Sequence, residues 1–178
     1  MRVDELDPAL ELDWPAALHQ VFRQAGVGLV SYVPDAGHRA LIDACGADPD
    51  IVTNVLTTEE EGIAIATGAW LGGTRSAVLM QSSGVGNCIN MLSLPVSARV
   101  PLLLLVTMRG EWAEFNPWQN PMGRATQTSL EAIGVTVLRA DTPIDVIEAV
   151  DQATTMAFDA DQQVAVLIGQ RLLGRKRW

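Results

Sequence analysis

The sequence has few cysteines and few histidines, and each scarcity argues against a class of site. Cys45 and Cys88 form no Cys-x-x-Cys pair and lie in segments with a helical pattern. We therefore expect two buried, small apolar residues and neither a zinc site nor a disulfide framework. The two histidines, His19 and His38, have no serine or cysteine partner that would predict a nucleophilic triad.

Positive charge is also scarce. Twelve Lys and Arg against 21 Asp and Glu give a net charge of -9, so the long-range field repels nucleic acid and acidic membrane surfaces. The chain starts with acidic residues, unlike the positive start of a signal peptide. The apolar run 101–108 ends at Arg109 and is too short to span a bilayer. We expect a soluble, cytoplasmic protein.

Two common phosphate-binding motifs are absent. No GxxxxGK[ST] occurs, which excludes a P-loop, and no GxGxxG follows the first expected strand, which disfavours a Rossmann dinucleotide site. An anionic ligand would then need local cations or backbone N–H groups.

The chain of 178 residues, 48% hydrophobic and 19% charged, is typical of one globular domain with a large core. We take residues 1–178 as a single domain, with tails at about 1–12 and 171–178. Short β-branched apolar runs alternate with helical patterns, which predicts an α/β three-layer sandwich with a central, mostly parallel six-stranded sheet. The expected strands are Gly28–Val33, Ile51–Val55, Ser76–Met80, Leu102–Thr107, Val135–Leu138 and Val164–Ile168. The expected helices are Pro15–Gln24, Gly37–Cys45, Glu59–Leu71, Gly86–Ser97, Thr126–Ala132 and Pro143–Phe158.

Two helix starts carry capping signals. Asp13 precedes Trp14-Pro15 as an N-cap, and Thr58 with Glu61 three residues later fits a capping box.

Ligands of open α/β sheets bind outside the carboxyl ends of the strands, so four following segments are candidates. In the first, 34–39, Asp35 is either a helix N-cap or a site residue, and His38 and Arg39 lie either on a solvated helix face or in a site. In the third, 81–87, the glycines either cradle a planar ligand or allow a tight turn. The fourth, 109–123, is a long loop whose tryptophans favour a protein interface.

The second segment, 56–62, ends in three carboxylates. Glu60 and Glu61 are explained by the helix dipole. Glu59 differs because it opens an apolar helix rich in small residues, so we expect it to be partly buried. A partly buried carboxylate has a raised pKa and can relay a proton near neutral pH.

Three motifs together resemble a known family. The motifs are, in chain order, TTEEEG leading to Gly68, MQSSGVGNCINML and PLLLLVTMRGE. Together they resemble the pyrimidine-binding (PYR) domain of thiamine-diphosphate enzymes. The likeness is greatest to the alpha subunits of sulfopyruvate decarboxylase and to phosphonopyruvate decarboxylases, and it covers residues 14–168. It implies a thiamine-diphosphate-dependent 2-oxo acid decarboxylase subunit, converting sulfopyruvate to sulfoacetaldehyde and CO2. The alternatives are phosphonopyruvate as substrate, another 2-oxo acid or an aldehyde-ligating reaction on the same cofactor, and a non-catalytic regulatory domain.

The resemblance also assigns roles to residues. Glu59, nine residues before Gly68, matches the acid that hydrogen-bonds the cofactor's aminopyrimidine. The remaining cofactor contacts implied by the resemblance are Pro34, Ser83, Gly84, Gly86 and Asn87. The substrate contacts that it implies are Asp35, Arg39, Arg109 and Gln119. The sequence departs from the family pattern at Asp35-Ala36 and at Met122.

Half of the family's active site is missing from the sequence. The diphosphate and Mg2+ of such enzymes are held by a PP domain with a GDG motif, and this sequence contains no GDG. The resemblance therefore implies a PP-domain beta subunit as partner in a hetero-oligomer, with the Mg2+ held mainly by that partner.

Overall fold

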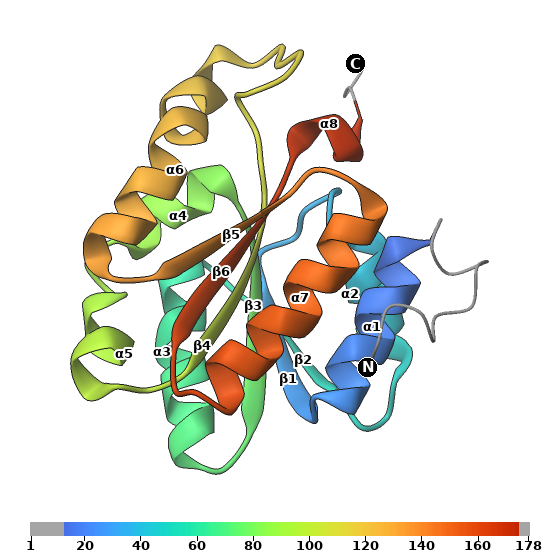
Figure 1. The fold of residues 1–178 in the computed structure, drawn as a ribbon, viewed down its shortest axis with the longest axis vertical. Helices are drawn as coiled ribbons and strands as arrows, with labels where there is room; N and C mark the ends of the chain where they lie inside the picture. The colour runs from blue at the N-terminus through green and yellow to red at the C-terminus, as the bar shows by residue number, and fades with distance from the viewer. Residues whose placement is uncertain (1–12, 175–178) are drawn as a thin grey trace.

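A parallel sheet forms the centre of the molecule (Figure 1). The computed structural model describes residues 13–174; residues 1–12, most of the expected first tail, and 175–178 lie outside the described part. The strand order is β2-β1-β3-β4-β6-β5, and all five neighbouring pairs are parallel. The strands are β1 (Val27–Tyr32), β2 (Val52–Val55), β3 (Arg75–Gln81), β4 (Leu102–Thr107), β5 (Thr136–Ala140) and β6 (Gln163–Ile168).

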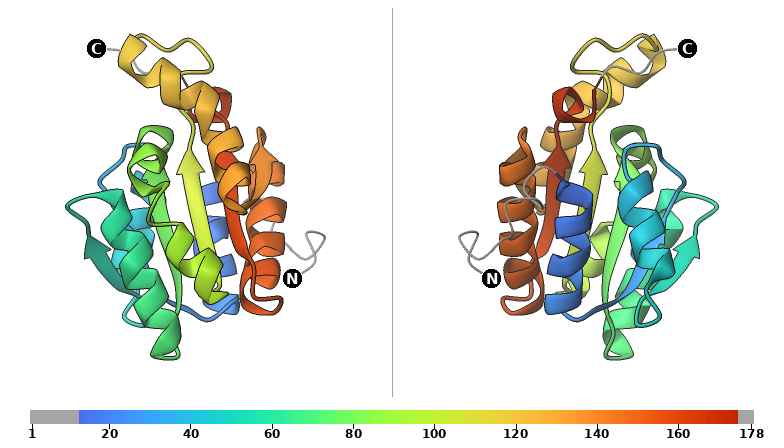
Figure 2. Two further views of the ribbon diagram at one scale, coloured as in Figure 1. Left: turned by 90° about the vertical axis from the view of Figure 1, so that its left-hand side faces the viewer. Right: turned by 90° about the vertical axis from the view of Figure 1, so that its right-hand side faces the viewer.

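Helices cover both faces of the sheet, which confirms the predicted three-layer sandwich (Figure 2). They are α1 (Trp14–Gln24), α2 (Arg39–Ala47), α3 (Glu59–Leu71), α4 (Ser82–Cys88), α5 (Ser93–Ala98), α6 (Asn120–Ile133), α7 (Pro143–Phe158) and α8 (Gln170–Leu173), with a 3-10 turn η2 (Pro117–Gln119). The segment at the start of α6 protrudes beyond the sheet, drawn in yellow at the top of Figure 2.

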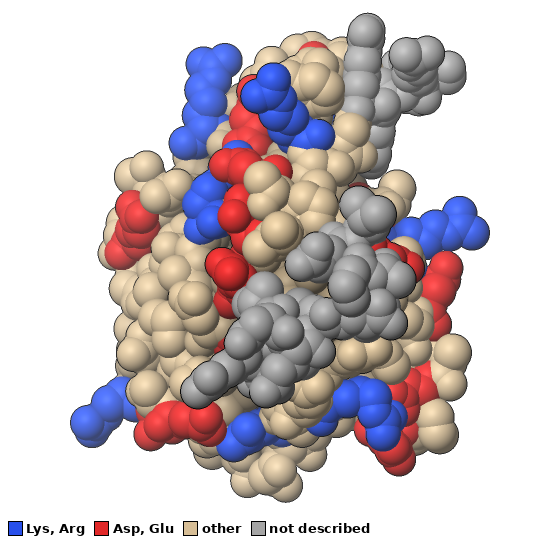
Figure 3. Space-filling model, turned by 45° about the vertical axis from the view of Figure 1, so that its right-hand side comes forward, with Lys and Arg blue, Asp and Glu red and all other residues tan. Residues whose placement is uncertain are grey.

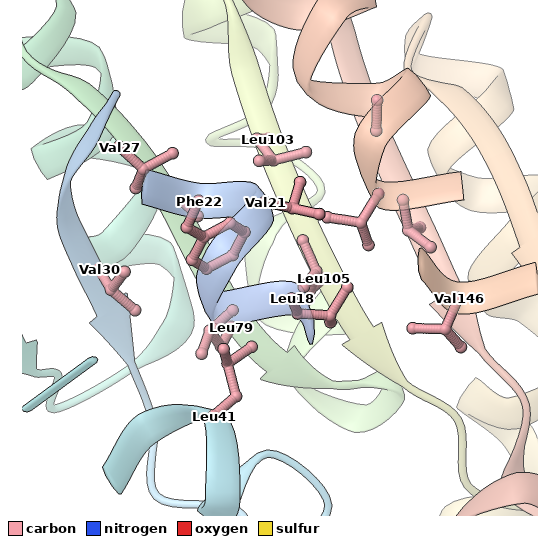
Figure 4. Packing of buried hydrophobic residues seen from close by; sticks show 14 of the residues in the cluster. Leu18, Val21, Phe22, Val27, Val30, Leu41, Leu79, Leu103, Leu105 and Val146 are labelled. Carbon is pink, nitrogen blue, oxygen red and sulfur yellow. The ribbon is translucent and has the colours of Figure 1, made fainter. Parts of the chain in front are cut away.

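Two apolar cores lie on opposite faces of the sheet. Helices α1, α2 and α7 pack on one face, where Phe22, Leu41 and Val146 meet strand residues such as Leu103 (Figure 4). Helices α3, α4 and α6 cover the other face. All six residues of β4 are buried, because this central strand is covered on both sides.

Two helix boundaries differ from the prediction. The expected helix 86–97 is two helices, α4 and α5, and α4 begins at Ser82 directly after β3. Pro95 explains the break, because proline has no N–H and is tolerated only in the first turn of a new helix. Helix α6 begins at Asn120 instead of Thr126, with Pro121 in its first turn. The expected second tail, from residue 171, overlaps α8.

One predicted cap is confirmed and the other is wrong. The Asp13 side chain accepts a hydrogen bond from the N–H of Ala16. Thr58 makes no side-chain cap bond, and Glu61 instead accepts from the N–H of Thr57. The reciprocal capping box occurs at the start of α7, between Thr142 and Asp145.

Both cysteines are buried and free, as expected, and burial raises the pKa of each thiol to about 12. None of the helices within residues 13–174 combines the length and the apolar run that crossing a bilayer requires. On the face shown in Figure 3, acidic and basic side chains lie next to one another.

Candidate active site

Glu59 is a buried carboxylate at the start of α3, as expected. The residue follows β2 in the chain and is only 9% exposed, whereas its neighbour Glu60 is exposed. Asn87 of α4 donates from Nδ2 to Glu59 Oε2 at 2.8 Å. Within residues 13–174, Oε1 receives no hydrogen bond. One carboxylate oxygen is thus oriented by the protein and the other is available to a ligand.

Gly84 makes room for this carboxylate. A Cβ built on Gly84 would lie 2.3 Å from Glu59 Oε1 and 2.4 Å from its Cδ. Any side chain at this position would therefore displace the acid. The glycine signal in segment 81–87 reflects close packing of helix α4 against Glu59, because no loop is present there.

Asp35 lies at the carboxyl edge of the sheet, held by the ends of two other strands. Gln81, which ends β3, donates to Asp35 Oδ1 at 2.5 Å, and Thr107, which ends β4, donates to Oδ2 at 2.6 Å. Asp35 is not a helix N-cap, because α2 begins at Arg39 after His38. The expected loop residue is in fact a fixed, half-buried carboxylate.

The surroundings of Asp35 favour its charged form. Burial acts to raise the pKa of Asp35, but the hydrogen bond from Thr107, the field of His38 and the hydrogen bond from Gln81 outweigh it, so the pKa lies below the ordinary value. An ionised carboxylate accepts hydrogen bonds and cannot donate a proton at neutral pH.

His38 is fully buried, so its assignment to a solvated helix face is wrong. Its Nε2 lies 3.1 Å from the carbonyl oxygen of Leu105, and burial lowers the pKa of the imidazole. The turn at residues 36–38 places this side chain against β4. Arg39, one residue later, is solvated: its side chain is 82% exposed and lies 3.6 Å from Asp43.

Arg109 follows β4 and is also buried. Its Nε and Nη2 both donate to the Glu114 carboxylate at 2.7 Å, and its guanidinium lies 5.8 Å from the centre of the Phe115 ring. Arg109 and Asp35 line one pocket of about 160 Å³, together with Thr107 and Gln170.

The structure separates the two arginines expected to contact substrate. Arg39 and Pro34 line a second pocket of about 410 Å³, with Tyr32, Ile42 and Val55. Asp35 and Ala36 border both pockets. Asp35 thus borders both pockets, whereas Arg109 lines the first and Arg39 the second.

The remaining expected site residues lie apart from these pockets. Gln119 lines neither, and its Oε1 is buried without a hydrogen-bond partner in the described chain. Ser83 is half-buried and Gly86 is exposed. A Cβ on Gly86 would lie 3.2 Å from the sulfur of Met122. Met122, where the sequence departs from the family pattern, therefore packs against α4.

Sequence reasoning singled out none of four residues that hold the site, although two of them, Gln81 and Glu114, lie in its candidate segments. Gln81 and Thr107 fix Asp35, while Glu114 and Gln170 fix Arg109. Gln81 and Thr107 end the two strands that follow β1 in the sheet, a signal readable only once the strand order is known.

Comparison with solved structures supports the fold. A 2-oxoglutarate:ferredoxin oxidoreductase from Magnetococcus marinus matches with a TM-score of 0.73 over 93% of this chain and 33% of that chain, at 18% identity. At that identity the likeness concerns the fold alone. No protein-family model matches the sequence.

Sequence relatives are more specific. The chain is 34% identical to sulfopyruvate decarboxylase subunit alpha of Methanococcus maripaludis over 85% of this chain and 92% of the relative. It is 33% identical to the subunit of the same name from Methanothermobacter thermautotrophicus, over 89% and 97%. A phosphonopyruvate decarboxylase of Streptomyces viridochromogenes is 39% identical, but over 60% of this chain and 27% of that protein. With near-complete coverage at this identity, the chain belongs to the family of sulfopyruvate decarboxylase alpha subunits.

Proposed function

We propose that this chain is the PYR-domain subunit of a thiamine-diphosphate-dependent decarboxylase that converts sulfopyruvate to sulfoacetaldehyde and CO2. The proposal rests on one observation above the others: a buried carboxylate, Glu59, is oriented on one oxygen and available on the other. Relatives named as alpha subunits of sulfopyruvate decarboxylase support the reaction and the substrate.

The residues around Glu59 fit the aminopyrimidine of thiamine diphosphate. Glu59 Oε1 would accept a hydrogen bond from the protonated N1′ of that ring, while Asn87 keeps the carboxylate turned toward it. Gly84 supplies the space that this arrangement requires. When bound, the cofactor supplies a nucleophilic carbon and an electron sink, so the chain needs no nucleophile of its own. Ser83, Gly86 and Pro34 remain further cofactor contacts in this proposal.

Arg109 and Asp35 would form the substrate side of the site. Arg109 lines the pocket that it shares with Asp35, and the surroundings of Asp35 favour its ionised form. The acidic group of a substrate would bind the arginine N–H groups and be repelled by the Asp35 carboxylate. These two interactions together would fix the orientation of the substrate in the pocket. Arg39, exposed in the neighbouring pocket, and Gln119 are further candidates for contact with the substrate.

A PP-domain subunit would complete the site. The sequence contains no GDG motif for the diphosphate and Mg2+, and the relatives are named as alpha subunits, which supports a second kind of subunit. Within residues 13–174, no group of three His, Cys, Asp or Glu side chains is placed to hold a metal ion. We assign the Mg2+ mainly to the partner and the activating acid to this chain. We also propose that the assembled enzyme works in the cytoplasm.

The test is to co-express the chain with a PP-domain subunit encoded beside it, add thiamine diphosphate and Mg2+, and follow CO2 release from sulfopyruvate and phosphonopyruvate in parallel. Release from sulfopyruvate that requires both chains is expected. Glu59→Gln should reduce turnover by at least about a hundredfold without preventing assembly, because the carboxylate is lost. The exposed neighbour supplies the control, Glu60→Gln, which should stay active.

Other results would separate the alternatives. Release from phosphonopyruvate alone would overturn the substrate assignment and retain the cofactor. No turnover of either acid in a cofactor-loaded complex would direct the search to other 2-oxo acids, and no turnover of any 2-oxo acid would support a regulatory domain. Full activity of Glu59→Gln would show that another group activates the cofactor.

A further inference from the structure

The loop after β4 folds around two side chains that the reaction scheme above does not use. Residues 110–116 contain little regular structure, yet Glu114 and Gln170 within and beside this loop are almost completely enclosed. Glu114 has a side chain only 3% exposed, and Gln170 is 4% exposed. Burying polar side chains to this degree is costly unless each is hydrogen-bonded.

Glu114 accepts five hydrogen bonds. Two come from Arg109 at 2.7 Å each, one from the N–H of Gly110 at 3.2 Å and one from the N–H of Asn116 at 3.0 Å. The fifth comes from Gln170 Nε2 at 2.8 Å. The hydrogen bonds from Arg109 lower the pKa of this carboxyl to about 2, against the opposing effect of burial. Glu114 is therefore a saturated acceptor that fixes the plane of the Arg109 guanidinium.

Gln170 connects this pair to the end of β6. Its side-chain Oε1 accepts hydrogen bonds from the backbone N–H groups of Glu111 and Trp112 at 3.1 and 3.0 Å. Its backbone N–H donates to Glu111 Oε1 at 2.9 Å. Glu111 in turn pairs with Arg139. A single amide side chain thus holds the backbone of the loop with its oxygen and Glu114 with its nitrogen.

Arg109 keeps donors free for a ligand. Its Nη1 has no acceptor within residues 13–174, and the residue lines the pocket that contains Asp35 and Gln170. The charges of Arg109, Glu114 and Asp35 sum to about -1, so the pocket has no excess of positive charge to attract an anion. Binding of an acidic group there must depend on the direction of the free N–H groups, which the bonds to Glu114 set.

We propose that Glu114 and Gln170 are positioning residues, which hold Arg109 so that its free N–H groups meet the acidic group of the substrate. This inference rests on the proposed function. It predicts that disturbing Gln170 raises KM and leaves kcat nearly unchanged, because Arg109 would hold the acidic group of the substrate and not its reacting carbon.

The decisive variant is Gln170→Glu. The introduced carboxylate can still accept from the N–H groups of Glu111 and Trp112, but it replaces the donor to Glu114 with a second acid. Two adjacent carboxylates share a proton at low pH and repel each other when both are ionised. Within residues 13–174, the charged groups around this position are Glu114, Glu111 with its partner Arg139, Arg109, and Asp35 in the same pocket.

The assay is CO2 release from sulfopyruvate by the two-subunit complex between about pH 5 and pH 8. Relative to the parent, Gln170→Glu should show a KM that rises with pH, by about tenfold at the upper end, while kcat follows the parent. Gln170→Met should show a raised KM at every pH. The exposed Gln20 supplies the control for added charge, since Gln20→Glu should match the parent throughout.

Several outcomes would overturn the inference. An active parent with unchanged KM in both Gln170 variants refutes the positioning role and leaves the proposed function intact. A pH-independent loss of kcat in Gln170→Glu would indicate a structural role only. If neither variant assembles, Glu114→Gln, which keeps one acceptor for Arg109, must raise KM or the inference fails. A parent inactive on sulfopyruvate refutes the proposed function, and this inference with it.

Discussion

Replacing Gly84 with alanine should separate activity from stability more sharply than changing the acid itself. The new Cβ would lie 2.3 Å from Glu59 Oε1, 2.4 Å from Cδ and 2.5 Å from Cγ, well inside van der Waals contact. The three nearest atoms all belong to one side chain and none to backbone. Glu59 must therefore swing away from its position, and the bond from Asn87 is lost with it.

The stability change follows from two opposing terms. Alanine in place of a helical glycine stabilises by about 0.5 to 1 kcal/mol. Losing the hydrogen bond from Asn87 to a charged carboxylate costs about 1.5 to 3 kcal/mol, part of which solvent returns once Glu59 moves outward. The free energy of unfolding of Gly84→Ala should thus lie within about 2 kcal/mol of the parent, whereas turnover should fall by at least about a hundredfold.

Two measurements on the same variant check this reasoning. Urea unfolding of the chain gives the stability, and CO2 release by the two-subunit complex gives the activity. Gly46 in α2 supplies the matched control, because nothing lies within 4 Å of its added Cβ and Gly46→Ala should be active and slightly stabilised. A fully active Gly84→Ala would refute the reasoning, since it would mean that turnover does not require Glu59 in its observed position.

Three further predictions concern the stability of the fold. Gly123→Ala should destabilise the chain by about 1 to 3 kcal/mol in urea unfolding, because its Cβ would lie 2.2 Å from the carbonyl oxygen of Arg109; an unchanged midpoint would contradict this close approach. The pKa of Glu114 is lowered to about 2, so its ionised form stabilises the fold above the unfolded pKa of about 4.3, and this stabilisation is lost as the pH falls toward 2. In Glu114→Gln, the free energy of unfolding should therefore depend less on pH in that range. A variant whose curve runs parallel to that of the parent would refute the assignment. Phe22 is fully buried, so Phe22→Ala should lower the free energy of unfolding by about 3 to 5 kcal/mol, measured by thermal or urea unfolding. Leu71 is 78% exposed, so Leu71→Ala should change it by less than about 0.5 kcal/mol. Similar losses in the two variants would contradict the core assignment.

The sequence alone determined the layered α/β architecture and the burial of Glu59. Alternating short apolar runs and helical patterns are local signals, since each element must bury its own apolar face. Glu59 could be chosen over Glu60 for the same reason, because it opens a helix whose apolar, small residues pack closely. Burial of the two cysteines was also predictable from their surroundings.

Only the tertiary structure decided how the candidate substrate residues are arranged. The strand order places the end of β1 beside β3, and β4 follows, so Gln81 and Thr107, 46 and 72 residues from Asp35, reach its carboxylate. Glu114, which binds Arg109, is itself held by Gln170, 56 residues further along the chain. Contacts at such separations leave no periodic trace in the chain, because they depend on which strand ends meet at the sheet edge and not on the neighbouring sequence.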